Sequence, residues 1–194
     1  MQEDNEIKVT QINDLIPMAV GTWTADRFLD AALPWTYWDR ADSKDLRLHN
    51  HFQMQHIVYN HDIALSPIYD ICMNILLTAM EKSGRKLDNW FKITIINSMP
   101  GDVAKSLPHI DIVGPHQTGL YFPFGSSGTT DIYKQRSFLQ SWDLPETYDL
   151  AHQLAPEFNT WYDFDGSHWR VDGRPVEHES RICVVYNFIS SPTE

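Results

Sequence analysis

The hydrophobic period of the chain changes at Gly84, and this change limits what the chain can fold into. Before Gly84, residues 66–83 carry apolar side chains at helical spacing, namely Ile68, Ile71, Cys72, Ile75, Leu76, Ala79 and Met80. After it, apolar residues alternate as in strands, over 90–97, 118–124, 129–133, 161–164, 168–171 and 181–188. Helical segments followed by short strands with Gly and Pro turns predict an antiparallel sandwich or barrel with helices on one outer face.

Two helices are expected in the first half of the chain. Ser66 is a natural N-cap, Pro67 fits the first helical position and Gly84 supplies a stop, which predicts a helix over 66–83. A shorter helix is expected over 24–33, with Thr24 as its cap and Pro34 after its end. Residues 134–160 lack a clear period, so we expect a loop with a short helix there.

Composition narrows the class of protein. The net charge is −11 and no Lys/Arg cluster is present, so we expect no nucleic-acid partner. No run approaches the length of a membrane span, so we expect no membrane partner. The only cysteines, Cys72 and Cys183, lie in apolar runs, which favours free thiols and a reducing, cytoplasmic location.

The pair His109 and Asp111 carries the first chemical signal. The motif His-x-Asp is weak alone, but this one follows a strand and a Pro-Gly loop and opens a further apolar stretch. Residues i and i+2 of a strand point to one side, so the imidazole and the carboxylate converge. Such nitrogen and oxygen donors suit a transition metal with an open coordination face.

A third metal ligand must come from elsewhere in the chain. His168 directly follows the turn at Gly166 and is our preferred candidate. His116, His152 and His178 remain alternatives.

Arg181 begins a strand whose two faces differ. Its own face continues through Cys183, Val185 and Asn187, while the opposite face is apolar and is expected to pack against the helices. An arginine pointing into a barrel needs an anionic partner, and a bound carboxylate ligand held through two hydrogen bonds is one candidate. The alternative is an ion pair within the chain, with Glu177, Glu179 or Asp172.

Together, His109-x-Asp111, His168 and Arg181 resemble the motif order of the 2-oxoglutarate- and Fe(II)-dependent dioxygenases, especially their small prolyl-hydroxylase-like and aspartyl/asparaginyl-hydroxylase-like members. The resemblance covers about residues 90–190. It implies a single domain, with a catalytic jelly-roll core (a double-stranded β-helix) over 90–190 and a helical elaboration over 1–89. It also implies Fe(II) held by His109, Asp111 and His168, and 2-oxoglutarate held by Arg181.

One position departs from the family pattern. Many relatives carry Ser or Thr two residues after the arginine, where this chain has Cys183. Tyr121 or Tyr133 is a candidate to supply the missing hydroxyl contact, and Asn97 is a further candidate for the pocket; ordinary core packing is the alternative for each. Asp165 and Ser167 are candidates to orient a metal-binding imidazole.

The resemblance implies a hydroxylase that uses dioxygen and acts on a small molecule or a peptide, with succinate and CO₂ as co-products. Two other functions remain open. One is a cupin-like metalloenzyme that needs no 2-oxoglutarate, and the other is a jelly-roll binding module without catalysis.

Overall fold

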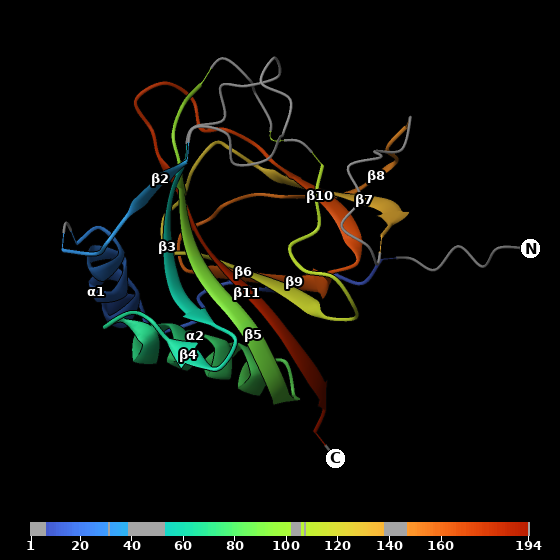
Figure 1. Cartoon of the computed structure of the whole chain (residues 1–194), viewed down its shortest axis with the longest axis horizontal. Helices are drawn as coiled ribbons and strands as arrows, with labels where there is room; N and C mark the ends of the chain where they lie inside the picture. Colours follow the sequence, from blue (N-terminus) through green and yellow to red (C-terminus); the bar gives the residue numbers. More distant parts are fainter. Residues whose placement is uncertain are drawn as a thin grey trace, which may run out of the picture.

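The computed structural model describes residues 7–30, 32–38, 53–101, 106, 108–137 and 147–193. Two antiparallel sheets face each other, and two helices cover the outer face of the larger one (Figure 1). The helices are α1 (Met18–Phe28) and α2 (Tyr69–Lys82). The predicted class, mostly β with flanking helices in a jelly roll, is confirmed.

The larger sheet has eight strands and contains both ends of the described chain. Its order is β1 (Thr10–Ile12), β9 (Thr160–Asp165), β6 (Gln117–Phe122), β11 (Arg181–Pro192), β5 (Arg85–Ser98), β3 (Gln53–Asn60) and β2 (Thr36–Trp38), with β4 (Ile63–Ala64) on β3. The smaller sheet has the order β10 (His168–Asp172), β7 (Thr130–Arg136) and β8 (Leu150–Leu154). Strand β11, central in the larger sheet, pairs with β5 and β6.

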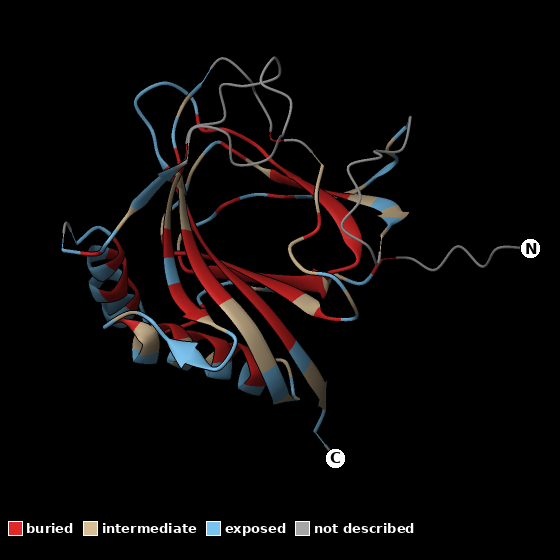
Figure 2. Ribbon diagram, viewed as in Figure 1, coloured by how far each residue is buried: buried red, intermediate tan, exposed pale blue. Residues whose placement is uncertain are grey.

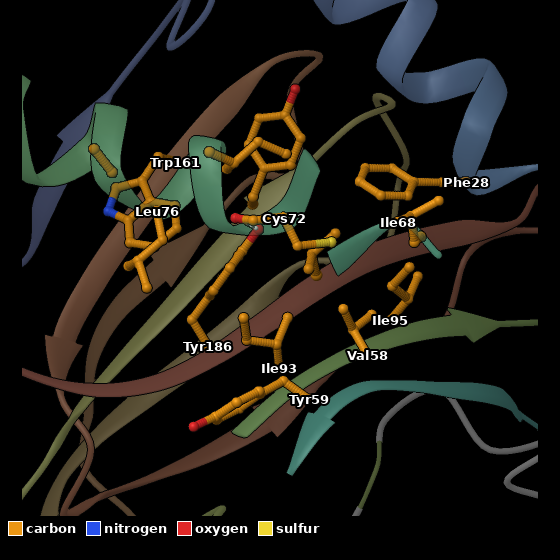
Figure 3. Packing of buried hydrophobic residues seen from close by; sticks show 14 of the residues in the cluster. Phe28, Val58, Tyr59, Ile68, Cys72, Leu76, Ile93, Ile95, Trp161 and Tyr186 are labelled. Atoms are coloured by element: carbon orange, nitrogen blue, oxygen red, sulfur yellow. Dashed lines mark hydrogen bonds between the residues drawn. The ribbon is translucent and has the colours of Figure 1, made fainter. Parts of the chain in front are cut away.

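The first core lies between the helices and the larger sheet (Figures 2 and 3). The apolar stripe of α2 supplies Cys72, Ile75, Leu76, Ala79 and Met80, as its helical spacing predicts. Facing them on β11 are Ile182, Val184, Tyr186 and Phe188. The Tyr186 hydroxyl donates a hydrogen bond to the Cys72 carbonyl at 3.1 Å, so the helix and the strand are also joined by a polar contact.

The second core lies between the two sheets and includes the opposite face of β11. Cys183 and Val185 pack there with residues of the smaller sheet such as Ile132 and Leu154. The predicted division of β11 into a helix-facing side and an interior side is therefore confirmed. Gly119 on β6 serves the first core, because a Cβ there would lie 2.4 Å from the Trp161 ring.

Both predicted helices have the wrong boundaries. Helix α1 begins at Met18, after Pro17, and Thr24 is a buried residue inside it and not its cap. Helix α2 begins at Tyr69, three residues later than expected. The Ser66 hydroxyl lies 2.6 Å from the His56 ring and accepts a hydrogen bond from the Ile68 amide. No side chain caps α2.

Two further segments differ from expectation. Residues 1–89, expected as a helical elaboration, also contribute β1, β2, β3 and β4 to the larger sheet. Within 134–160 the described residues include strand β8, while 138–146 lie outside the described residues. No helix in the described part of the chain is long and apolar enough to cross a membrane.

Candidate functional site

Two charged side chains of β10 and one of β11 meet the His109–Asp111 segment between the two sheets. They are Arg170, Asp172 and Arg181, and all three are buried. A backbone bridge brings the segment to β10, because His109 and Arg170 exchange two hydrogen bonds of 3.0 Å. The predicted strand at 109–111 is reduced to this single bridge. We call the five residues His109, Asp111, Arg170, Asp172 and Arg181 the charged cluster.

Arg170 lies between the two carboxylates of the charged cluster. Its Nη2 donates to Asp111 Oδ1 at 2.7 Å, and its Nη1 donates to Asp172 Oδ2 at 2.8 Å and Oδ1 at 3.0 Å. Its side chain is 2% exposed, so water screens these ion pairs little. The single guanidinium charge is thus shared between both carboxylates.

Arg181 is buried, and its hydrogen bonds go to other groups of the chain. It donates to the Gly128 carbonyl at 2.8 Å, to the Thr130 hydroxyl and to Asp172 Oδ1 at 3.1 Å. Its guanidinium carbon also lies 5.2 Å from the centre of the Phe122 ring, within range of a cation–π contact. Asp172 is therefore an ion-pair partner of Arg181. This pair is the alternative that the sequence analysis gave to a bound carboxylate ligand.

A close approach of two glycines fixes the position of the Gly128 carbonyl. A Cβ on Gly128 would lie 2.6 Å from the Gly173 carbonyl oxygen, and one on Gly173 would lie 2.7 Å from the Thr129 oxygen. Neither position has room for a side chain, so the start of β7 lies directly against the end of β10.

The His109 imidazole faces both carboxylates. Its Nε2 lies 3.9 Å from Asp111 Oδ1 and 3.8 Å from Asp172 Oδ2. The second oxygen of Asp111 receives hydrogen bonds from Asn187 at 3.2 Å and Thr118 at 3.4 Å. The His109 Nε2 atom therefore faces the carboxylate groups of both Asp111 and Asp172.

Both carboxylates are ionised. Burial alone raises the pKa of Asp111, but the charges of Arg170 and His109 and the hydrogen bonds from Arg170 and Asn187 outweigh it and lower the pKa to about 2. Burial acts in the same way on Asp172, and the charges of Arg170 and Arg181 lower its pKa below the usual range. The two aspartates are thus in the form that binds cations.

His168 does not join the charged cluster. Its Nδ1 lies 3.0 Å from the Tyr133 carbonyl oxygen, and its Nε2 accepts a hydrogen bond from Arg136 at 2.9 Å. Burial, followed by the Arg136 charge, lowers the pKa of its imidazole. Arg136 also pairs with Asp165 at 2.9 Å, and the Asp165 carboxylate accepts bonds from Ser167. Asp165 thus reaches the His168 imidazole only through Arg136.

The other candidate histidines also lie elsewhere. His116 contacts the Gly114 carbonyl and Thr118, and reaches Asp111 only through the Thr118 hydroxyl. His152 contacts the Ile7 carbonyl, and the side chain of His178 is 89% exposed. Among the residues that the structure describes, no three His, Cys, Asp or Glu side chains are arranged closely enough to hold a metal ion.

The three candidates for the pocket do not share a strand face with Arg181. Tyr121 lies in the first core and donates to Asn159. Tyr133 alternates with Thr130 and Ile132 along β7, and its ring packs against Tyr148 at 5.1 Å. Asn97 pairs in register with Ile182, which places it on the helix-facing side of the sheet.

An open pocket of about 1050 Å³ is lined by residues outside the charged cluster. Its lining includes His116, His168, Arg136 and Asp165, but no member of the cluster. The charged members of the cluster are paired with one another, and the His109 side chain is 30% exposed.

Sequence reasoning missed Arg170 and Thr118. It named Asp172 only as a possible partner of Arg181, and Asn187 only as a residue on the same strand face. A signal was present, because Arg170 and Asp172 alternate with apolar Val171 along one strand, and charged residues on the inner face of a strand need partners.

Comparison with known proteins supports the fold. No family model and no curated protein sequence matches the chain. Among solved structures, the non-heme alpha-ketoglutarate-dependent epimerase SnoN from nogalamycin biosynthesis is 10% identical, with a TM-score of 0.63, over 95% of this chain and 79% of that one. A Pseudomonas putida prolyl-4-hydroxylase is 10% identical, with a TM-score of 0.59, over 94% and 92% of the two chains.

A third similar structure is an oxidoreductase of the 2OG-Fe(II) oxygenase family from Burkholderia pseudomallei. It is 13% identical, with a TM-score of 0.62, over 93% of this chain and 84% of that one. SnoN has also been solved with Fe³⁺ and alpha-ketoglutarate bound. The chain therefore has the fold of the 2-oxoglutarate- and Fe(II)-dependent oxygenases, and the resemblance seen in the sequence is confirmed at the level of the fold.

Proposed function

We propose that this protein is an oxygenase that depends on Fe(II) and 2-oxoglutarate. The observation that carries the proposal is the charged cluster: inside a fold shared with such oxygenases, an imidazole and two ionised carboxylates face one another beside a buried arginine. An imidazole and carboxylates are a donor set that suits ferrous iron.

In this proposal His109, Asp111 and Asp172 hold the iron. Asp172 takes the role that the sequence gave to His168, because both nitrogens of His168 are engaged with β7. The donor types suit a divalent cation, but no three such side chains among the described residues are arranged closely enough to hold one. However, both carboxylates are now paired with Arg170, so a metal has to compete with that guanidinium.

Arg181 binds a carboxylate of 2-oxoglutarate in this proposal. Its bonds to Gly128 and Thr130 and its contact with Phe122 hold the guanidinium in place. Many relatives carry a Ser or Thr hydroxyl where this chain has Cys183, and the Thr130 hydroxyl beside Arg181 takes that role here. The Cys183 thiol is buried, and burial raises its pKa to about 12. Thr130, and not Tyr121 or Tyr133, then supplies the hydroxyl contact.

When bound, Fe(II) and 2-oxoglutarate supply the oxidising chemistry that uses dioxygen. The residues of the chain have three tasks: to orient the donors, to anchor the cosubstrate and to exclude water. Asn187 and Thr118 orient Asp111 through its second oxygen. We propose hydroxylation of a small molecule or a peptide in the cytoplasm. The net charge of −11 favours a neutral or cationic substrate.

The test combines a spectrum with product analysis. Fe(II) and 2-oxoglutarate are added without oxygen, and a weak visible charge-transfer band is expected in the parent protein and absent from His109→Ala. Oxygen then yields succinate, measured across a panel of peptides and free amino acids. His168→Ala is the matched control, and it keeps the band if Asp172 is the third donor. No band and no succinate in the folded parent protein would overturn the proposal.

One observation favours a second candidate, a jelly-roll binding module that needs no metal. Arg170 and Arg181 together carry two positive charges against the two carboxylates, so these charges are balanced without iron. Calorimetry distinguishes the two candidates: a module of this kind binds a dicarboxylate with the same affinity with and without a divalent metal.

A further inference from the structure

The Thr118 hydroxyl on β6 lies between two groups that can accept its hydrogen. Its oxygen is 3.3 Å from His116 Nε2 and 3.4 Å from Asp111 Oδ2. The Asn187 amide donates to Asp111 Oδ2 at 3.2 Å and to the Thr118 oxygen at 3.4 Å. Thr118 and Asn187 are each 1% exposed, and His116 is 5% exposed. Because so little of these residues reaches the surface, they depend on one another for hydrogen bonds.

The tautomer of His116 follows from the contact of its other ring nitrogen. His116 Nδ1 lies 2.9 Å from the Gly114 carbonyl oxygen. A carbonyl oxygen only accepts, so the hydrogen of the neutral ring is on Nδ1 and the lone pair is on Nε2. A hydroxyl has one hydrogen, so Thr118 cannot donate to His116 Nε2 and to Asp111 Oδ2 at once. While His116 is neutral, one of these two acceptors therefore lacks the hydrogen of Thr118.

Gly166 holds the His116 ring in this network. A Cβ at position 166 would lie 2.2 Å from His116 Nε2, and the Gly166 amide donates to the His116 carbonyl at 2.9 Å. The backbone at 166 thus lies directly against the ring, where no side chain fits. His116 also lines the open pocket, so its ring connects the pocket with Thr118. The charged and titratable side chains that share the lining are Lys8, Arg85, Arg136, Asp163, Asp165 and His168.

One additional proton removes the shortage of donors. If His116 Nε2 takes up a proton, it donates to the Thr118 oxygen, and the Thr118 hydrogen then points to Asp111. Asp111, with a pKa of about 2, is ionised and remains an acceptor in both states. Each acceptor of the network then has a donor, and hydrogen bonds in such a chain strengthen one another.

We propose that His116 is a proton-binding positioning residue, and that Thr118 relays its protonation state to Asp111. The proton comes from solvent in the pocket, and the only covalent bond that forms is N–H at His116 Nε2. Asp111 Oδ2 has the Asn187 amide as a donor in both states, and it gains the Thr118 hydroxyl as a fixed second donor when His116 is protonated. The inference goes beyond the proposed function, because it requires neither iron nor 2-oxoglutarate.

The test follows the whole chain by NMR, with ¹⁵N-labelled histidine and ¹³C-labelled aspartate, from about pH 8.5 to about pH 5. His116→Gln identifies the His116 signals by their loss. At the alkaline end, Nδ1 of the parent should carry the hydrogen and Nε2 should not. On acidification Nε2 should gain a hydrogen. The ¹³C shift of the Asp111 carboxyl should change with the same midpoint, although Asp111 itself does not titrate in this range.

Thr118→Val removes the hydroxyl and keeps a side chain of similar shape. The midpoint of His116 protonation should fall by about one pH unit, a tenfold loss of proton affinity, because the imidazolium loses a buried acceptor. The Asp111 carboxyl shift should no longer follow His116. Thr118→Ser keeps the hydroxyl and should restore both results.

Thr94→Val is the matched control. Thr94 is also buried on the interior side of the larger sheet, where it pairs with Val185, but its hydroxyl has no hydrogen-bond partner within the described residues. The His116 midpoint and the Asp111 shift should both stay at their parental values in this variant.

Four results would overturn the relay. They are a hydrogen on Nε2 of the parent at the alkaline end, an Nε2 that gains no hydrogen by about pH 5, equal His116 midpoints in the parent and Thr118→Val, and an Asp111 shift that still follows His116 in that variant. If Thr118→Val fails to fold, the tautomer and the shared midpoint in the parent decide the question. The proposed function is untouched by each of these results, because its own test is the charge-transfer band and succinate formation.

Discussion

The two faces of β11 use opposite means to bury their side chains. The helix-facing side, with Ile182, Val184, Tyr186 and Phe188, packs against α2 in an apolar core whose parts can be exchanged for others of similar volume. The interior side begins with Arg181, whose burial depends on Asp172, Gly128 and Thr130 in their present positions. One strand thus combines an apolar face with a face that begins with a buried charge held by specific partners.

We expect loss of a charged partner on the interior side of β11 to lower the free energy of unfolding most. Asp172→Asn should lower the free energy of unfolding by about 3–5 kcal/mol, because Arg170 and Arg181 both lose a buried counter-charge. Urea denaturation measures the change. Asp88→Asn on the exposed part of β5 is the control, with an expected effect within about 0.5 kcal/mol. A loss for Asp172→Asn as small as that of the control would show that the cluster does not stabilise the fold.

Substitutions in the apolar core on the helix-facing side of β11 should lower the free energy of unfolding by a smaller amount. Leu76→Ala should cost about 3 kcal/mol, because Leu76 is fully buried against the larger sheet and its loss leaves a cavity. The adjacent Leu77 is 48% exposed, and Leu77→Ala should cost much less. Equal midpoints of urea unfolding for the two variants would contradict the packing described for α2.

Arg181 has two roles in these proposals: it stabilises the fold through its pair with Asp172, and it binds 2-oxoglutarate. Arg181→Gln should weaken 2-oxoglutarate binding, measured by calorimetry with Co(II) present, by about tenfold or more, near 1.4 kcal/mol. Co(II) affinity itself should stay within about threefold, because Arg181 is not a donor to the metal. An unchanged affinity for 2-oxoglutarate would remove Arg181 from the proposed site.

The smallest effect expected is a pH dependence from His168. Burial lowers the pKa of this imidazole in the folded state, so below the unfolded value of about 6.5 the unfolded chain binds more protons than the folded one. Stability should therefore fall as the pH decreases through that value. Urea midpoints at pH 7.5 and pH 5.5 should differ less in His168→Gln than in the parent. In His178→Gln, which alters an exposed imidazole, the parental difference should remain.

Local patterns predicted most of the fold. The alternation of β11, the stripe of α2 and the change of period at Gly84 depend on neighbours in sequence, so they can be read without coordinates. Helix ends were harder to predict. Ser66, for example, has the residue type of a cap, but its side chain bonds to His56, ten residues away. That contact belongs to the tertiary structure.

The site was predicted in part. His109, Asp111 and Arg181 do reach one cluster, whereas His168, chosen for its place after the turn at Gly166 and for the family's motif order, does not. The pairing of β10 with β7 shifts between His168 and Arg170, so two residues of β10 span four of β7. Such a bulge turns a side chain away from the face that simple alternation predicts. No count of residues along the sequence reveals where the bulge falls.

The contact of Gly128 with Gly173 has a consequence for the evolution and redesign of this protein. A larger residue at either position would push two strands apart and carry with them the carbonyl that holds Arg181. New specificities are thus more accessible at positions away from these two glycines than at the glycines themselves. Libraries that spare the two glycines should retain far more folded members than those that vary them.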